Sequence, residues 1–183
     1  MDKRAADDAT QIAAARAGDL DAFETLVRRH TPAVYSHALR FFGESTAAED
    51  VVQEVFIKVF RSLGSFDNRS QFSTWLYQVT RNTCLDQVRA GRRRPVPVDP
   101  FLMSATDPID IADSVAVSAS VEHALASLPN DDRDALLAVA LFGLTYDEAA
   151  RVFEIPAGTV KSRVFRARRT IALSLNIADG GLS

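Results

Sequence analysis

The stretch that decides the fold, residues 128–171, reads LPNDDRDALLAVALFGLTYDEAARVFEIPAGTVKSRVFRARRTI. It contains the signals of a helix, a tight turn and a further helix. Gly143 is placed to end one helix, because glycine readily adopts the left-handed conformation at a helix C-terminus. Thr145 and Glu148 have the spacing of a capping box, and Pro156 suits the first turn of the following helix. The stretch therefore predicts a helix-turn-helix.

The last helix of this stretch has two chemically different faces. Four apolar residues fall on one narrow stripe, which predicts the core side: Val160, Val164, Ala167 and Ile171. A helix that enters the DNA major groove needs this division, because one side is anchored while the other offers donors to bases and phosphates. The predicted −35 DNA-binding residues lie opposite or beside the stripe: Lys161, Ser162, Arg163, Phe165, Arg166 and Arg169. The alternative is an ordinary amphipathic surface helix with solvated arginines.

Residues 46–63 predict a second strong helix, with Thr46 and Glu49 at capping-box spacing. Its broad apolar face consists of Val51, Val52, Val55, Phe56, Val59 and Leu63, and its other side gathers Asp50, Gln53, Glu54 and Ile57. An isoleucine exposed among acids indicates a protein-docking surface. The competing interpretation is a solvated face with one stray apolar residue.

Aromatic and basic residues interleave between residues 63 and 94. On a helix beginning near Ser73, one side carries Trp75, Gln78, Asn82 and Arg89. Rings on which unstacked bases can stack, together with arginines that follow phosphates, suit single-stranded DNA. The alternative is that the rings belong to the core. We prefer the core for Phe72 and Leu76, and for Trp75 both interpretations stay open.

Composition places these elements in an all-α protein of two small helical domains joined by a flexible linker. We expect domains at residues 8–94 and 118–175, because the acidic, proline-containing segment 95–117 argues against regular structure. The net charge of −3 hides a basic segment at residues 156–172. The single cysteine, Cys84, allows no internal disulfide, and the polar start lacks a signal-peptide core, so a cytoplasmic location is expected.

No catalytic motif stands out in the chain. The three histidines lie far apart, and Cys84 has no CxxC partner. A phosphate-binding glycine loop, a nucleophile elbow and a zinc-protease motif are all missing. We therefore expect a protein that is not an enzyme and that needs no cofactor or metal.

Two long blocks resemble one known family. The block AEDVVQEVFIKVFRSLGSF at residues 48–66, followed by FSTWLYQVTRN at 72–82, resembles region 2 of the extracytoplasmic-function (ECF) sigma factors. The stretch at 128–171 resembles region 4 of the same group. The resemblance implies a subunit that binds core RNA polymerase and directs promoter-specific transcription initiation. It also implies docking on the polymerase β′ clamp helices and β flap, and control by an anti-sigma factor.

The resemblance also assigns roles to residues. It implies a polymerase-binding face made of Asp50, Gln53, Glu54 and Ile57. It places −10 recognition and melting in the loop at 65–71 and the helix after it, for which our candidates are Phe66, Asn68, Arg69, Trp75, Gln78, Asn82, Asp86 and Arg89. Two other classes remain as alternatives: a stand-alone helix-turn-helix regulator, and a helical adaptor that does not depend on Arg163 or Arg166.

Overall fold

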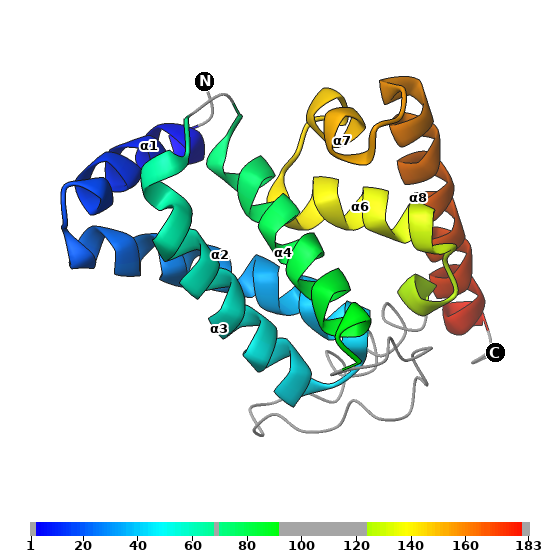
Figure 1. Ribbon diagram of the computed structural model, residues 1–183. Helices are drawn as coiled ribbons and strands as arrows, with labels where there is room; N and C mark the ends of the chain where they lie inside the picture. The colour runs from blue at the N-terminus through cyan, green and yellow to red at the C-terminus, as the bar shows by residue number, and fades with distance from the viewer. Residues whose placement is uncertain (1–2, 68–69, 92–123, 181–183) are drawn as a thin grey trace.

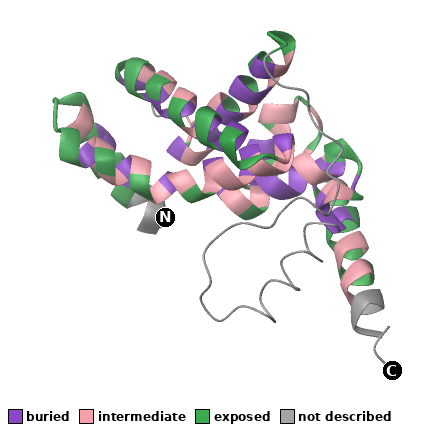
Figure 2. Ribbon diagram, turned by 90° about the horizontal axis from the view of Figure 1, so that it is seen from below, coloured by how far each residue is buried: buried purple, intermediate pink, exposed green. Residues whose placement is uncertain are grey.

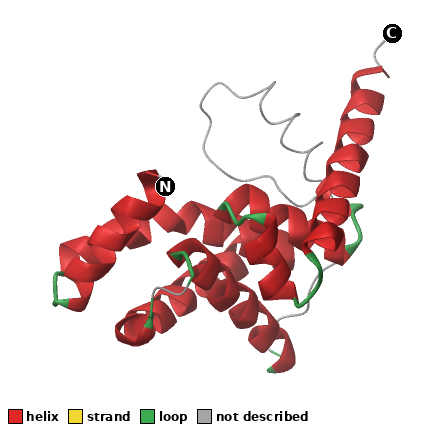
Figure 3. Cartoon of the chain, turned by 90° about the horizontal axis from the view of Figure 1, so that it is seen from above, coloured by secondary structure: helices red, strands yellow, loops and turns green. Residues whose placement is uncertain are grey.

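The computed structural model describes residues 3–67, 70–91 and 124–180, with side chains described for 7–67, 70–91 and 124–175. Across those residues every regular element is a helix and no strand occurs (Figure 3). The all-α prediction is confirmed. The segment expected to be a linker, residues 95–117, and the basic cluster Arg92 to Arg94 lie outside the described residues.

The first group of helices comprises α1 (Lys3–Arg16), α2 (Leu20–Phe42), α3 (Ser45–Ser62), the 3-10 turn η1 (Leu63–Ser65) and α4 (Phe72–Arg89). Asp19 caps α2 by accepting a hydrogen bond from the Ala22 backbone at 3.0 Å. Gly43, with φ of 70°, ends α2 in the left-handed region. Only Glu44 separates this glycine from α3, and it forms no side-chain cap. The predicted Thr46–Glu49 capping box is therefore wrong.

The core of this group is built from the apolar faces of α2, α3 and α4. Seven side chains have at most 1% of their surface exposed: Leu26, Val34, Phe42, Val51, Val55, Val59 and Leu76. Burying one side chain of this size contributes roughly 1.5–3 kcal/mol. The predicted core face of residues 46–63 is confirmed, although Val52 is only partly buried. Phe72 is also buried, as preferred from the sequence.

The second group contains α6 (Asn130–Phe142), α7 (Tyr146–Phe153) and α8 (Ala157–Gly180). Gly143 ends α6 with φ of 71°. Thr145 and Glu148 form the predicted capping box at the start of α7, where the Glu148 carboxylate accepts from the Thr145 backbone at 2.8 Å. The helix-turn-helix prediction is confirmed as an arrangement of helices. It extends further than expected, because α8 continues to Gly180.

The two groups pack against each other along α4, which lies between α2–α3 and α6–α7 (Figure 1). The Tyr77 ring contacts the rings of Phe142 and Phe153, with centroids 5.1 and 5.9 Å apart. An ion pair joins Arg81 to Asp134 at 3.9 Å. We call the set His37, Tyr77, Arg81, Asp134, Phe142 and Phe153 the aromatic seam. Figure 2 shows buried residues gathered in the middle of the molecule.

Polar groups in the aromatic seam are poorly satisfied. Neither ring nitrogen of His37 nor the Tyr77 hydroxyl has a hydrogen-bond partner among the described residues. Burial, reinforced by the positive charges of Arg81, Arg40 and Arg133, lowers the pKa of His37 to about 4. Burial likewise raises the pKa of Tyr77 far above its ordinary value. His37 is therefore neutral at pH 7. Protonation of His37 works against the packing of the two helix groups at the aromatic seam.

Candidate nucleic-acid interface

The outward face of α8 carries the predicted DNA-binding residues. Val160, Val164 and Ala167 are at most 1% exposed, and they anchor the helix against α6 and α7. The opposite side leaves 66% of Phe165 exposed to solvent. The remaining predicted residues, Lys161, Ser162, Arg166 and Arg169, are exposed as well, whereas Arg163 is half-buried. The helix thus presents one surface of positive charge and one aromatic ring.

Two arginines of this face are paired with acids at the start of α6. Arg163 Nη2 donates to Asp131 at 2.5 Å. Arg166 donates from Nε and Nη2 to the two oxygens of Asp132, at 2.9 and 2.7 Å. The hydrogen bond to Asp132 raises the pKa of Arg166, which stays a cation. Helical spacing could not predict these pairs, because they join residues more than 30 positions apart.

The candidate −10 residues on α4 come together on one side, as the helical spacing predicts. Gln78, Asn82 and Arg89 are exposed, and Trp75 is partly exposed. The fifth α4 candidate, Asp86, pairs with Arg89 at 3.5 Å and with Lys58 at 3.6 Å.

Of the loop candidates, Phe66 is turned inward. It is only 6% exposed, and its ring lies tilted against the Trp75 ring, with the centroids 5.0 Å apart. Asn68 and Arg69 lie outside the described residues. The described part of the candidate −10 surface is therefore the exposed side of α4.

The candidate polymerase-binding face on α3 is mostly exposed to solvent. Asp50 and Gln53 are exposed, as is half of Ile57. Glu54 is more constrained, since Lys58 pairs with it at 3.0 Å and Gln87 donates to it at 3.2 Å.

Sequence reasoning missed an aromatic extension of this face. Phe60 is 54% exposed, and its ring meets the Phe23 ring edge-on at 5.0 Å. Phe60 follows Ile57 by three positions, which places the two on the same side of the helix. This spacing is the signal by which Phe60 could have been found.

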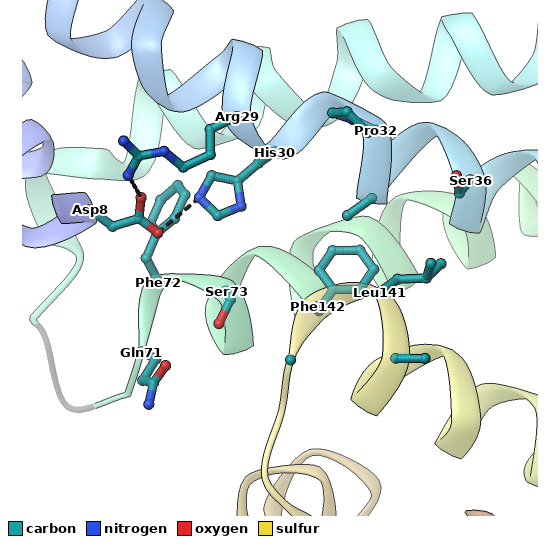
Figure 4. A pocket seen from close by; sticks show the side chains of 13 residues that line it. Asp8, Arg29, His30, Pro32, Ser36, Gln71, Phe72, Ser73, Leu141 and Phe142 are labelled. Atoms are coloured by element: carbon teal, nitrogen blue, oxygen red, sulfur yellow. Dashed lines mark hydrogen bonds and ion pairs between the residues drawn. The ribbon is translucent and has the colours of Figure 1, made fainter. Parts of the chain in front are cut away.

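A cavity of about 290 Å³ lies where α2 and the start of α4 meet the end of α6 (Figure 4). At one end, Asp8 accepts a hydrogen bond from Arg29 at 2.6 Å and pairs with His30 at 2.9 Å. Burial favours the neutral acid, but these two partners outweigh it and hold the pKa of Asp8 below its ordinary value. The cluster joins α1 to α2, so we assign it a structural role.

The described residues offer little chemistry for catalysis. Burial and the nearby Asp134 raise the pKa of the Cys84 thiol to about 12, so it is a poor nucleophile at neutral pH. Within the part of the chain that the structure describes, no three His, Cys, Asp or Glu side chains form a potential metal site. Among the described helices, none combines the length and apolar character needed to cross a bilayer.

The fold and these surfaces define a two-domain helical protein with a helix-turn-helix, and sequence comparison identifies its family. Residues 26–94 match the model of Sigma-70 region 2, and residues 118–171 match that of Sigma-70, region 4. The chain belongs to the sigma-70 family, in its ECF group.

Curated relatives cover most of the chain. It is 35% identical to the RNA polymerase sigma-H factor of Pseudomonas aeruginosa over 170 residues, covering 86% of this chain and 88% of that protein. It is 38% identical to the ECF RNA polymerase sigma-E factor of Escherichia coli K12 over 166 residues, covering 84% and 86%. The protein is thus a transcription initiation factor that gives RNA polymerase promoter specificity, rather than a classical enzyme.

Two solved complexes share the fold. One is CnrH with the cytosolic domain of CnrY, at a TM-score of 0.68 and 26% identity, covering 93% of this chain and 98% of that one. The other is the sigma factor RpoE with the anti-sigma factor NepR from Bartonella quintana, at a TM-score of 0.65 and 28% identity, covering 85% and 97%.

Proposed function

We propose that residues 118–175 read the −35 promoter element through α8, while residues 8–94 dock on core polymerase through α3 and engage the −10 element through α4. The segment 95–117 joins the two units. The observation that carries this division is the outward face of α8, with Phe165 exposed and Arg166 presented beside it. We place the protein in the cytoplasm, where RNA polymerase acts.

The geometry of α8 supports readout of duplex DNA. Its buried stripe fixes the helix on α6 and α7, so its exposed side chains reach a groove without deforming the domain. Lys161 and Arg169 supply charge for phosphates, and Ser162 can bond to a base or a phosphate. Phe165 suits an apolar contact such as a thymine methyl.

The exposed side of α4 suits single-stranded DNA in the −10 element. Trp75 offers a ring on which a base can stack, and Asn82 offers both a donor and an acceptor for a base edge. Asp86 forms part of the same surface. On α3, Asp50, Gln53 and Ile57 form a mixed polar and apolar surface suited to the polymerase β′ clamp helices. We also place a contact for the β flap on residues 118–175.

We further propose that an anti-sigma factor holds the protein inactive. The support is the likeness to RpoE, which was solved with the anti-sigma factor NepR. The apolar surface around Ile57 and Phe60 is a suitable target, because covering it also blocks polymerase docking.

Transcription by core polymerase on a library of randomised promoters tests this function. With the purified protein added, transcripts should start downstream of one pair of enriched elements, spaced for the −35 and −10 positions. Without the protein, core polymerase should show no such enrichment. Transcripts that are unchanged by the protein would reject the proposal.

Changing Arg166 to alanine should relax selection at one position of the −35 element. A bidentate contact between an arginine and a guanine discriminates against other bases by roughly 10- to 100-fold. The same library, sequenced after transcription, measures the preference at each position. Lys161→Ala is the matched control, since loss of a phosphate contact should weaken all sequences about equally. If both variants weaken transcription equally from all promoter sequences, Arg166 does not read a base.

A further inference from the structure

Arg166 is held side-on by a nearly buried carboxylate. Its Nε and Nη2 donate to Asp132 at 2.9 and 2.7 Å, while 59% of the arginine side chain but only 7% of the aspartate side chain is exposed. Asp132 lies in the first turn of α6, where the helix dipole favours a negative charge. The aspartate is therefore fixed, and the arginine takes its orientation from it.

Asp132 occupies the Nε–Nη2 edge of the guanidinium and does not use the Nη1–Nη2 edge. Nη1 and the second hydrogen of Nη2 lie outside the Asp132 pair. Together they form an edge that can donate to O6 and N7 of a guanine in the major groove. An arginine without such a support spreads over many rotamers, and its full charge is attracted to the nearest phosphate.

We propose that Asp132 is a positioning residue that aims Arg166 at a base edge rather than at phosphate, and so sets the base preference at one −35 position. This inference rests on the proposed reading of the −35 element by α8. The carboxylate offsets much of the arginine's charge, which weakens its attraction to phosphate. It also orders the side chain before DNA arrives, so less conformational entropy is lost on binding.

The neighbouring pair provides a matched comparison. Arg163 reaches Asp131 through one nitrogen, and the Asp131 side chain is 69% exposed. A carboxylate that faces water and makes a single contact is screened, and it orients its arginine weakly. Asp131→Asn and Asp132→Asn remove the same charge from adjacent positions of the same helix turn.

The test compares these two variants with the wild type in complex with core polymerase. We measure the base preference at every −35 position with the promoter library, and the salt dependence of promoter binding. In Asp132→Asn, preference at one position should fall by about 10-fold, while the salt slope steepens by about one phosphate contact. In Asp131→Asn, the preferences should keep their wild-type pattern.

The background variant Arg166→Ala adds a second check. In that background, Asp132→Asn should have no further effect on base preference, because its effect acts through the arginine. Thermal unfolding, followed by circular dichroism, tests whether each variant is folded. If Asp132→Asn unfolds, Asp132→Glu keeps the charge but shifts its position, and it should alter the same promoter position.

The outcomes separate this inference from the proposed function. If a folded Asp132 variant keeps the wild-type preferences, or loses affinity equally for all sequences, the positioning role is wrong while −35 reading stands. If the wild type itself shows no preference at any −35 position in the same assay, the proposed function fails instead.

Discussion

Acidification from pH 6.5 to pH 4 should lower the free energy of unfolding by about 3 kcal/mol through His37 alone. The pKa of His37 lies near 4 in the folded protein and near 6.5 in the unfolded chain. The unfolded chain therefore binds a proton throughout this interval that the folded protein does not, at about 1.4 kcal/mol per pH unit. This part of the free energy of unfolding is fully present above pH 6.5 and is lost as the pH falls toward 4. Urea unfolding at a series of pH values measures it.

Replacing His37 by phenylalanine should remove this pH dependence. The ring contacts with Tyr77 and Phe142, at 5.5 and 6.0 Å, suit a second phenyl ring, and neither nitrogen of His37 forms a hydrogen bond that is lost. The control is His30→Gln, which also replaces a buried histidine but should leave the His37 effect in place. If the free energy of unfolding falls equally with pH in the wild type and in His37→Phe, protonation of His37 does not cause the pH dependence.

Two carboxyl groups act on stability in other ways. The pKa of Asp8 is lowered, so its contribution is present above its ordinary pKa of 3.8 and is lost only as the pH falls through its still lower folded value. Burial raises the pKa of Asp134, so protonation of this group favours the folded state as the pH falls. Both effects largely cancel when the free energy of unfolding of His37→Phe is compared with that of the wild type, because both proteins contain Asp8 and Asp134.

Changing Ile57 to glutamate should weaken binding to core polymerase by about 30-fold or more. Half of Ile57 is exposed on α3, where we place the contact with the β′ clamp helices. A charge buried at the centre of an interface without a partner costs roughly 2 kcal/mol or more. Titration of the labelled protein with core polymerase, followed by fluorescence anisotropy, measures the change in Kd.

Ala9→Glu is the matched control for this variant. Ala9 is also an exposed apolar residue, but it lies on α1, where we place no contact with polymerase or DNA. It introduces the same charge and should leave the Kd within a factor of about two, as for a surface change away from an interface. Equal losses in both variants would show that the effect follows from added negative charge rather than from the α3 face.

Much of the fold could be predicted from the sequence because its signals are local. The Gly143 stop, the Thr145 capping box and the stripe of Val160 and Val164 each depend on residues within a few turns of one another. The Thr46 capping box failed for a local reason as well. Gly43 ends α2 so close to α3 that Glu44 takes the N-cap position.

The contacts between distant segments could not be predicted in this way. The pairs Arg81–Asp134 and Arg166–Asp132 join residues that no helical period relates. Periodicity placed Arg166 on the outer face of its helix but could not show that a carboxylate orients it. Phe66 was expected to be available to DNA, and its burial follows from the contact of its ring with Trp75 on α4.

Direct binding to core RNA polymerase tests the central claim. The purified protein, mixed with core polymerase that carries no other specificity subunit, should elute with it as a single complex during size-exclusion chromatography. The complex should then protect one promoter at both the −35 and −10 elements, whereas the free protein should protect neither. Separate elution of the protein and polymerase at micromolar concentrations would contradict the account.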